Sequence, residues 1–113
     1  MRRIMRIAAT AGAVTLATGL ALAQQRTPGN VNNGHELAKT WCAGCHLIEP
    51  NETTARDAVP SFTAVAAMKS TTELSLQAFL QTPHDHMPDW RLSRQQIDDV
   101  SAYIMSLRPA SSS

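Results

Sequence analysis

The chain has 113 residues, with 10 Lys or Arg and 9 Asp or Glu, so its length and charge suit a single near-neutral domain. It contains only two cysteines, which excludes a zinc site built from four of them. Without a basic leader at residues 1–23, seven basic and nine acidic residues remain, and a net charge of −2 excludes the cationic surface typical of nucleic-acid-binding proteins.

Residues 1–23 have the pattern of a secretory signal peptide. Three arginines precede an apolar run over residues 7–22, and a small-x-small cleavage site occupies residues 21–23. The run is interrupted by threonines and glycines and is short for a span that needs about 20 apolar residues, so an uncleaved anchor is the less favoured alternative. We expect export to the periplasm and a mature chain without a membrane span.

A first helix is predicted shortly after the cleavage site. Residues 24–32 are polar and are expected to form a flexible leader. Asn33 and Glu36 then fit a capping pattern, which predicts a helix over residues 34–41 with its apolar positions on one face. The folded domain is expected to cover residues 33–108 and to be followed by a disordered tail, residues 109–113.

The sequence Cys42-Ala43-Gly44-Cys45-His46 is the Cys-x-x-Cys-His motif that attaches a c-type haem. Two thiols on one helical turn can reach the same edge of the macrocycle and add to its two vinyl groups, while the adjacent imidazole reaches the iron. A thioredoxin-like redox pair and a surface disulfide are alternatives. The first needs a βαβ context that the sequence does not indicate, and neither explains His46. We therefore expect one haem c, bound covalently through Cys42 and Cys45.

With this motif the chain resembles the class I c-type cytochromes, which are small proteins with one haem, over about residues 33–107. The resemblance implies an all-α fold in which about four short helices and their loops surround the haem. It implies that Gly34 packs against the last helix, whose Tyr103-Ile104 pair crosses the first. It also implies that the carbonyl of Pro60 accepts the proton on Nδ1 of His46; a simple turn at Pro60 is the alternative.

The remaining elements follow from periodicity and capping. Residues 47–60 are predicted to be an irregular loop with solvated charges, and helices are predicted over residues 62–68, 72–81 and 94–107. The helix over 72–81 is expected to bury Leu76, Phe79 and Leu80. A Ser93–Gln96 capping box begins the last helix.

The loop between the last two helices holds the candidates for the second axial ligand. Met87 is preferred, because His-Met-Pro resembles the ligand loop of the family and a thioether raises the reduction potential. His84 and His86 are alternatives that would give bis-histidine ligation, and an open site is another. The helical methionines Met68 and Met105 are expected to fill the core.

Two tryptophans lie near the expected ligands. Trp90 is expected either to donate a hydrogen bond to a haem propionate or to pad the ligand loop, and Trp41 is expected to be a core residue.

These features predict a soluble periplasmic electron carrier that cycles between Fe(III) and Fe(II) with His/Met ligation and docks on redox partners. The protein would not itself be an enzyme. An alternative is a dedicated cytochrome subunit of a periplasmic dehydrogenase. A five-coordinate peroxidase or gas sensor would require that Met87 does not bind.

Overall fold

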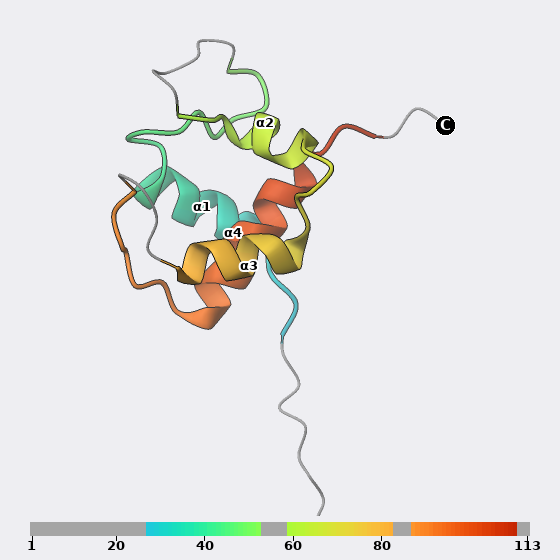
Figure 1. Cartoon of the computed structure of the whole chain (residues 1–113). Helices are drawn as coiled ribbons and strands as arrows, with labels where there is room; N and C mark the ends of the chain where they lie inside the picture. Colours follow the sequence, from blue (N-terminus) through green and yellow to red (C-terminus); the bar gives the residue numbers. More distant parts are fainter. Residues whose placement is uncertain (1–26, 53–58, 83–86, 111–113) are drawn as a thin grey trace, which may run out of the picture.

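The computed structural model describes residues 27–52, 59–82 and 87–110 of the chain, and within these ranges every secondary-structure element is a helix (Figure 1). The all-α fold expected from the sequence is therefore confirmed. The predicted signal peptide (residues 1–23), residues 24–26 of the expected leader, and residues 53–58, 83–86 and 111–113 lie outside the described residues. The helices are α1 (Val31–Trp41), α2 (Phe62–Ala67), α3 (Glu73–Gln81) and α4 (Arg94–Ser106).

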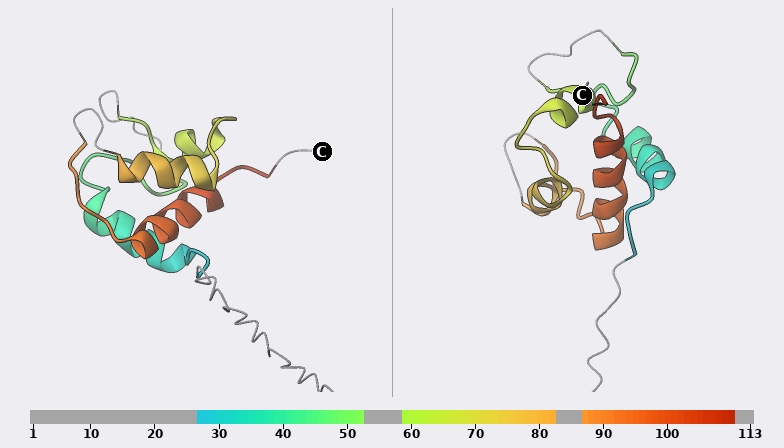
Figure 2. Two further views of the ribbon diagram at one scale, coloured as in Figure 1. Left: turned by 60° about the horizontal axis from the view of Figure 1, so that its bottom comes forward. Right: turned by 90° about the vertical axis from the view of Figure 1, so that its right-hand side faces the viewer.

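Helix α4 is at the centre of the packing, because it contacts each of the other three helices. Its contact with α1 is the most extensive, and the two helices cross while α2 and α3 lie along other sides of α4 (Figures 1 and 2). The buried apolar residues come from all four helices and the loop after α1; they are Ala38, Cys42, Leu47, Ile48, Phe62, Ala66, Leu76, Ile97, Val100, Tyr103 and Ile104.

The crossing of α1 and α4 requires a glycine. A Cβ atom on Gly34 would lie 2.0 Å from the carbonyl oxygen of Asp99 and 2.8 Å from Cβ of Tyr103. The helix backbones thus approach more closely than any side chain permits, as the family resemblance implied. Gly29, just before α1, is equally tight against the carbonyl oxygen of Asp98, at 2.1 Å.

Helix α1 begins three residues earlier than the sequence predicted. Its N-cap is Asn30, whose Oδ1 accepts a hydrogen bond from the backbone N–H of Asn33 at 3.0 Å, so Asn33 is not the cap. The backbone N–H of Asn30 in turn donates to Oδ1 of Asp99 on α4, at 2.7 Å. Glu36 receives no capping contact and instead pairs with Lys39 at 3.2 Å. The α1 cap is therefore fixed by tertiary contact as well as by local sequence.

The other helix starts agree with the local patterns. Ser93 and Gln96 form the predicted capping box of α4, and Thr72 and Ser75 form a second capping box at α3. Arg108 follows α4 and donates to the carbonyl oxygens of Ala66, at 2.9 Å, and Thr71, which joins the end of α4 to the α2–α3 turn.

Two expectations about the core are wrong. Phe79 is 52% exposed and Met68, the C-cap of α2, is 48% exposed, whereas Leu76 and Gln77 bury the inner side of α3. Periodicity identifies an apolar stripe but not how much of it other protein side chains cover. None of the helices in the described ranges is long and apolar enough to cross a membrane.

Candidate haem site

The Cys-x-x-Cys-His motif forms a compact turn that continues α1. Cys42 is the C-cap of the helix, and its carbonyl oxygen accepts hydrogen bonds from the backbone N–H groups of Cys45, at 3.1 Å, and His46, at 2.9 Å. Both cysteines are free thiols; Cys42 is buried and Cys45 is exposed. Burial raises the pKa of the Cys42 thiol to about 11, so it is protonated at neutral pH. The turn presents both cysteines from one short segment.

The imidazole of His46 is oriented by the backbone of the segment before α2. Its Nδ1 atom lies 2.7 Å from the carbonyl oxygen of Pro60. A carbonyl oxygen can only accept, so Nδ1 carries the proton and Nε2 keeps its lone pair. The described residues form no hydrogen bond or ion pair with Nε2. The histidine is thus held in the tautomer that a metal ligand requires, with its second nitrogen available.

An aromatic contact supports the other side of this imidazole. The ring centroid of Phe62, at the start of α2, lies 5.4 Å from that of His46, and Phe62 is buried. Phe62 also packs on Tyr103 of α4, with ring centroids 6.4 Å apart. The sequence did not indicate that Phe62 is a neighbour of His46, because only the tertiary fold brings the start of α2 beside the motif turn.

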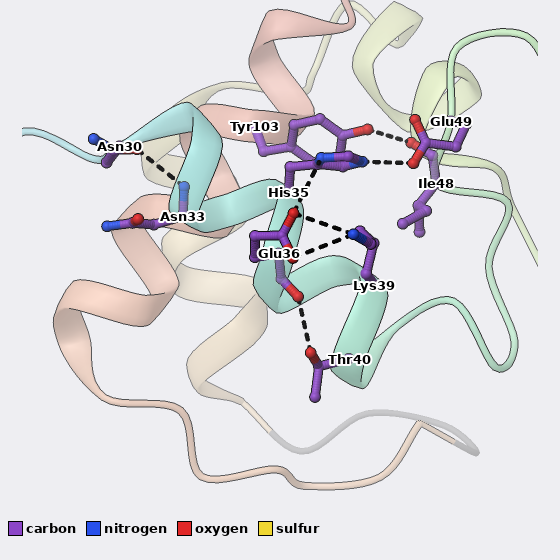
Figure 3. A network of polar contacts seen from close by, with 9 residues as sticks. All are labelled: Asn30, Asn33, His35, Glu36, Lys39, Thr40, Ile48, Glu49 and Tyr103. Atoms are coloured by element: carbon purple, nitrogen blue, oxygen red, sulfur yellow. Dashed lines mark hydrogen bonds and ion pairs between the residues drawn. The ribbon is translucent and has the colours of Figure 1, made fainter.

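The loop after the motif is joined to α1 and α4 by a polar network (Figure 3). Tyr103 donates its hydroxyl proton to the carbonyl oxygen of Ile48 at 2.7 Å, and Nε2 of His35 lies 2.5 Å from Oε1 of Glu49. The His35 ring also stacks on Tyr103, at a centroid distance of 4.9 Å. The prediction that the charges of the loop over residues 47–60 are solvated is therefore wrong for Glu49, which binds His35. This network anchors the loop whose far end carries Pro60.

Met87 lies in a shallow hollow formed by the segment between α3 and α4. The hollow is lined by Leu80, Thr82, Met87, Pro88, Asp89, Trp90, Arg91 and Leu92. Met87 itself is partly buried. The alternative ligands His84 and His86 lie outside the described residues. Met105 packs against the core as expected, whereas Met68 does not.

The two tryptophans, far apart in sequence, are neighbours in the structure. The ring centroids of Trp41 and Trp90 are 5.1 Å apart, with their planes tilted by 55°. Trp41 is 40% exposed and Trp90 is 43% exposed, so the expectation that Trp41 is a core residue is wrong. Trp41 precedes Cys42 directly, and this adjacency was the one sequence feature that linked it to the site.

The residues present fit a haem. A flat apolar ring needs thiols at one edge, a nitrogen ligand with a fixed tautomer, and apolar side chains that the protein itself leaves uncovered. The motif turn supplies the thiols, and His46 supplies the ligand. Large apolar side chains remain exposed, namely Trp41, which directly precedes Cys42, Trp90, which contacts Trp41, and Phe79 on α3. Exposed apolar surface of this extent is unusual in a small domain unless it contacts a ligand or partner.

The motif, the helical fold and the prepared histidine define a cytochrome c. Comparison with known proteins agrees. The chain belongs to the cytochrome c family: the family model described as cytochrome C oxidase, cbb3-type, subunit III, matches residues 29–104. The chain is also 42% identical over 80 residues to cytochrome c-552 of Bradyrhizobium diazoefficiens, an alignment that covers 71% of this chain and 77% of that protein. No solved structure matches significantly.

Membership of this family makes the protein a cytochrome c electron carrier, for which a covalently attached haem c and redox partner proteins are implied.

Proposed function

We propose that this chain is an exported cytochrome c with one haem, attached through Cys42 and Cys45, whose iron is bound by His46 on one face and Met87 on the other. The observation that carries the proposal is the hydrogen bond from Nδ1 of His46 to the carbonyl oxygen of Pro60. It fixes the ligating tautomer and raises the basicity of the imidazole, as the outer partners of metal-binding histidines do.

When bound, the haem supplies a one-electron couple between Fe(III) and Fe(II). The protein residues determine how that couple behaves. Two thioether bonds prevent loss of the haem, and Phe62 restricts movement of His46. Met87 supplies a soft sulfur ligand that favours Fe(II), so the reduction potential is higher than with two histidines. Filling both axial positions leaves no site for oxygen or peroxide, which suits a carrier rather than a peroxidase.

Periplasmic location and docking behaviour are parts of the same proposal. The basic and apolar pattern of residues 1–23 supports export, and covalent attachment of haem prevents loss of the cofactor from so small a domain. The mature net charge of −2 supports weak electrostatic docking on partners with basic surfaces. Trp90 is proposed to contribute to haem binding by packing on the ligand loop.

A second candidate is a lasting subunit of a periplasmic oxidoreductase, such as a dehydrogenase. The observation that favours it is that the matching family is named for a subunit of an oxidase. The haem chemistry would be the same, but the interface would be permanent and would bury more apolar surface than a transient one. Co-purification of a stoichiometric partner with the exported protein would support the subunit, and a monomer in size-exclusion chromatography would support the free carrier.

The ligand assignment is tested by comparing Met87→Ala with Met68→Ala, which truncates an exposed methionine at the end of α2. We expect the parent and Met68→Ala to show the far-red sulfur–iron charge-transfer band in the ferric state. Met87→Ala should lose this band, have a lower reduction potential and bind carbon monoxide when reduced.

An unchanged band in Met87→Ala would remove Met87 from the site. If the parent lacks the band and His86→Ala or His84→Ala alters the spectrum instead, the ligation is bis-histidine.

A further inference from the structure

The contact between Trp41 and Trp90 connects two segments that the proposed function places on opposite sides of the haem. Trp41 is the last residue of α1 and directly precedes Cys42, whereas Trp90 follows Met87 by three residues. A centroid distance of 5.1 Å and a tilt of 55° are typical of a favourable aromatic pair. Both rings are about two-fifths exposed, so filling of the core does not explain the contact.

The backbone around Trp90 is held in a specific and uncommon conformation. Arg91 has φ of 47°, in the left-handed region that residues other than glycine rarely adopt. Its backbone N–H donates to Oδ1 of Asp89 at 3.1 Å, which closes a tight turn around Trp90. Such a conformation persists only where surrounding contacts favour it. The contact between the rings of Trp90 and Trp41 is one such contact, because Trp90 is the residue between Asp89 and Arg91 in this turn.

Trp90 and Met87 share one hollow. Leu80, Pro88 and Leu92 complete its apolar lining. The segment that contains Met87 and Trp90 runs from beside the carboxyl end of α1 to the start of α4 (Figures 1 and 2). Because Trp90 follows Met87 by three residues, displacement of this segment from the end of α1 would separate Trp90 from Trp41.

We propose that Trp41 and Trp90 are positioning residues that hold the Met87 loop against the haem-attachment turn and so control how readily the thioether leaves the iron. The inference rests on the proposed function, in which Met87 is the axial ligand. An aromatic pair of this geometry is expected to shift the equilibrium between bound and released thioether by about two- to tenfold. Neither tryptophan needs to touch the iron for this effect.

The test measures displacement of Met87 in the ferric holoprotein by added imidazole, which binds the iron only after the thioether has left. Trp41→Ala and Trp90→Ala should each bind imidazole about two- to tenfold more tightly than the parent. The double variant should bind no more tightly than the stronger single variant, because both substitutions remove the same contact. Trp41→Phe, which keeps an aromatic ring, should have an affinity for imidazole between those of the parent and Trp41→Ala.

Leu74→Ala is the matched control, because Leu74 is an apolar side chain on α3 that is 73% exposed and lies outside the tryptophan pair. It should leave the affinity for imidazole unchanged. Unchanged affinity in both tryptophan variants, or effects that multiply in the double variant, would overturn the proposal.

A second readout separates failure of this inference from failure of the ligand assignment. Two indoles at this distance should give an exciton couplet in circular dichroism that both alanine variants lose; a parent without the couplet would overturn the pair itself. If the sulfur–iron band is present in the parent but imidazole affinity does not change, the positioning role fails while Met87 remains the ligand. A parent without the band would overturn both.

Discussion

The carbonyl oxygen of Pro60 lies 2.7 Å from Nδ1 of His46, although the two residues belong to opposite ends of a long loop. The beginning of this loop is held by contacts from α1 and α4, through His35 on Glu49 and Tyr103 on Ile48. Orientation of the imidazole therefore depends on helices that do not touch it directly, and this dependence can be tested by substitution.

Replacing Pro60 by glycine should raise the reduction potential. The substitution frees the backbone dihedral that proline fixes, so the carbonyl is less well positioned and its hydrogen bond to His46 weakens. A less basic imidazole stabilises Fe(III) less. Ser61→Ala is the control: it removes the N-cap of α2, at a cost of about 1 kcal/mol in stability, but leaves the carbonyl in place. Redox titration of both variants checks this, and equal potentials in Pro60→Gly and the parent would contradict it.

Replacing Gly34 by alanine should destabilise the protein by about 3 kcal/mol or more, because the added Cβ would lie 2.0 Å from the backbone oxygen of Asp99. The matched control is Gly44→Ala in the motif turn, where a Cβ would meet no atom within 4 Å. We expect the control to change stability by no more than about 0.5 kcal/mol. Denaturant unfolding of the two holoproteins measures the difference; similar midpoints would show that the α1–α4 crossing is less tight than described.

Tyr103 should titrate above its usual value of 10.0, because burial, and secondarily the charges of Glu49 and Glu52, raise its pKa. It is the only tyrosine in the chain, so phenolate absorbance reports on it alone. The folded state favours the neutral phenol. The contribution of the neutral Tyr103 phenol to stability is therefore complete below the pKa of Tyr103 in the unfolded chain, near 10. It is lost as the pH rises through the pKa of Tyr103 in the folded protein.

Tyr103→Phe should remove this alkaline loss while costing about 1 kcal/mol at neutral pH, from the lost hydrogen bond to Ile48. Stability measured against pH in both proteins provides the check. The prediction would be contradicted if Tyr103 titrated in the folded parent at or below the pH at which it titrates in the protein unfolded in denaturant.

Much of the fold could be predicted from local sequence, because capping and periodicity act over a few residues. Ser93 with Gln96 correctly located the start of α4, and the helix predicted over residues 72–81 agrees with α3 to within one residue. At α1 the local pattern indicated Asn33 as the cap, whereas the cap is Asn30, whose backbone N–H donates to Oδ1 of Asp99, a residue distant in sequence. No local pattern contains that information.

The residues of the candidate site likewise divide into those that a local pattern identifies and those that only tertiary contacts bring together. Cys42, Cys45 and His46 are contiguous, so the motif identified them. The contact between His35 and Glu49 and the pairing of Trp41 with Trp90 join segments distant in sequence, and the sequence alone did not predict them. The exposure of Phe79 could not be predicted either, because periodicity does not show which side chains leave apolar surface for a cofactor.

The central claim is that a haem is joined to this chain through both sulfur atoms of the motif. The most direct test is the reduced pyridine haemochrome spectrum of the purified protein after extraction with acidified acetone. We predict that the colour stays with the protein and that the α band lies at the position characteristic of two thioether bonds. A colourless protein after extraction, with Cys42 and Cys45 free or joined in a disulfide, would contradict the account.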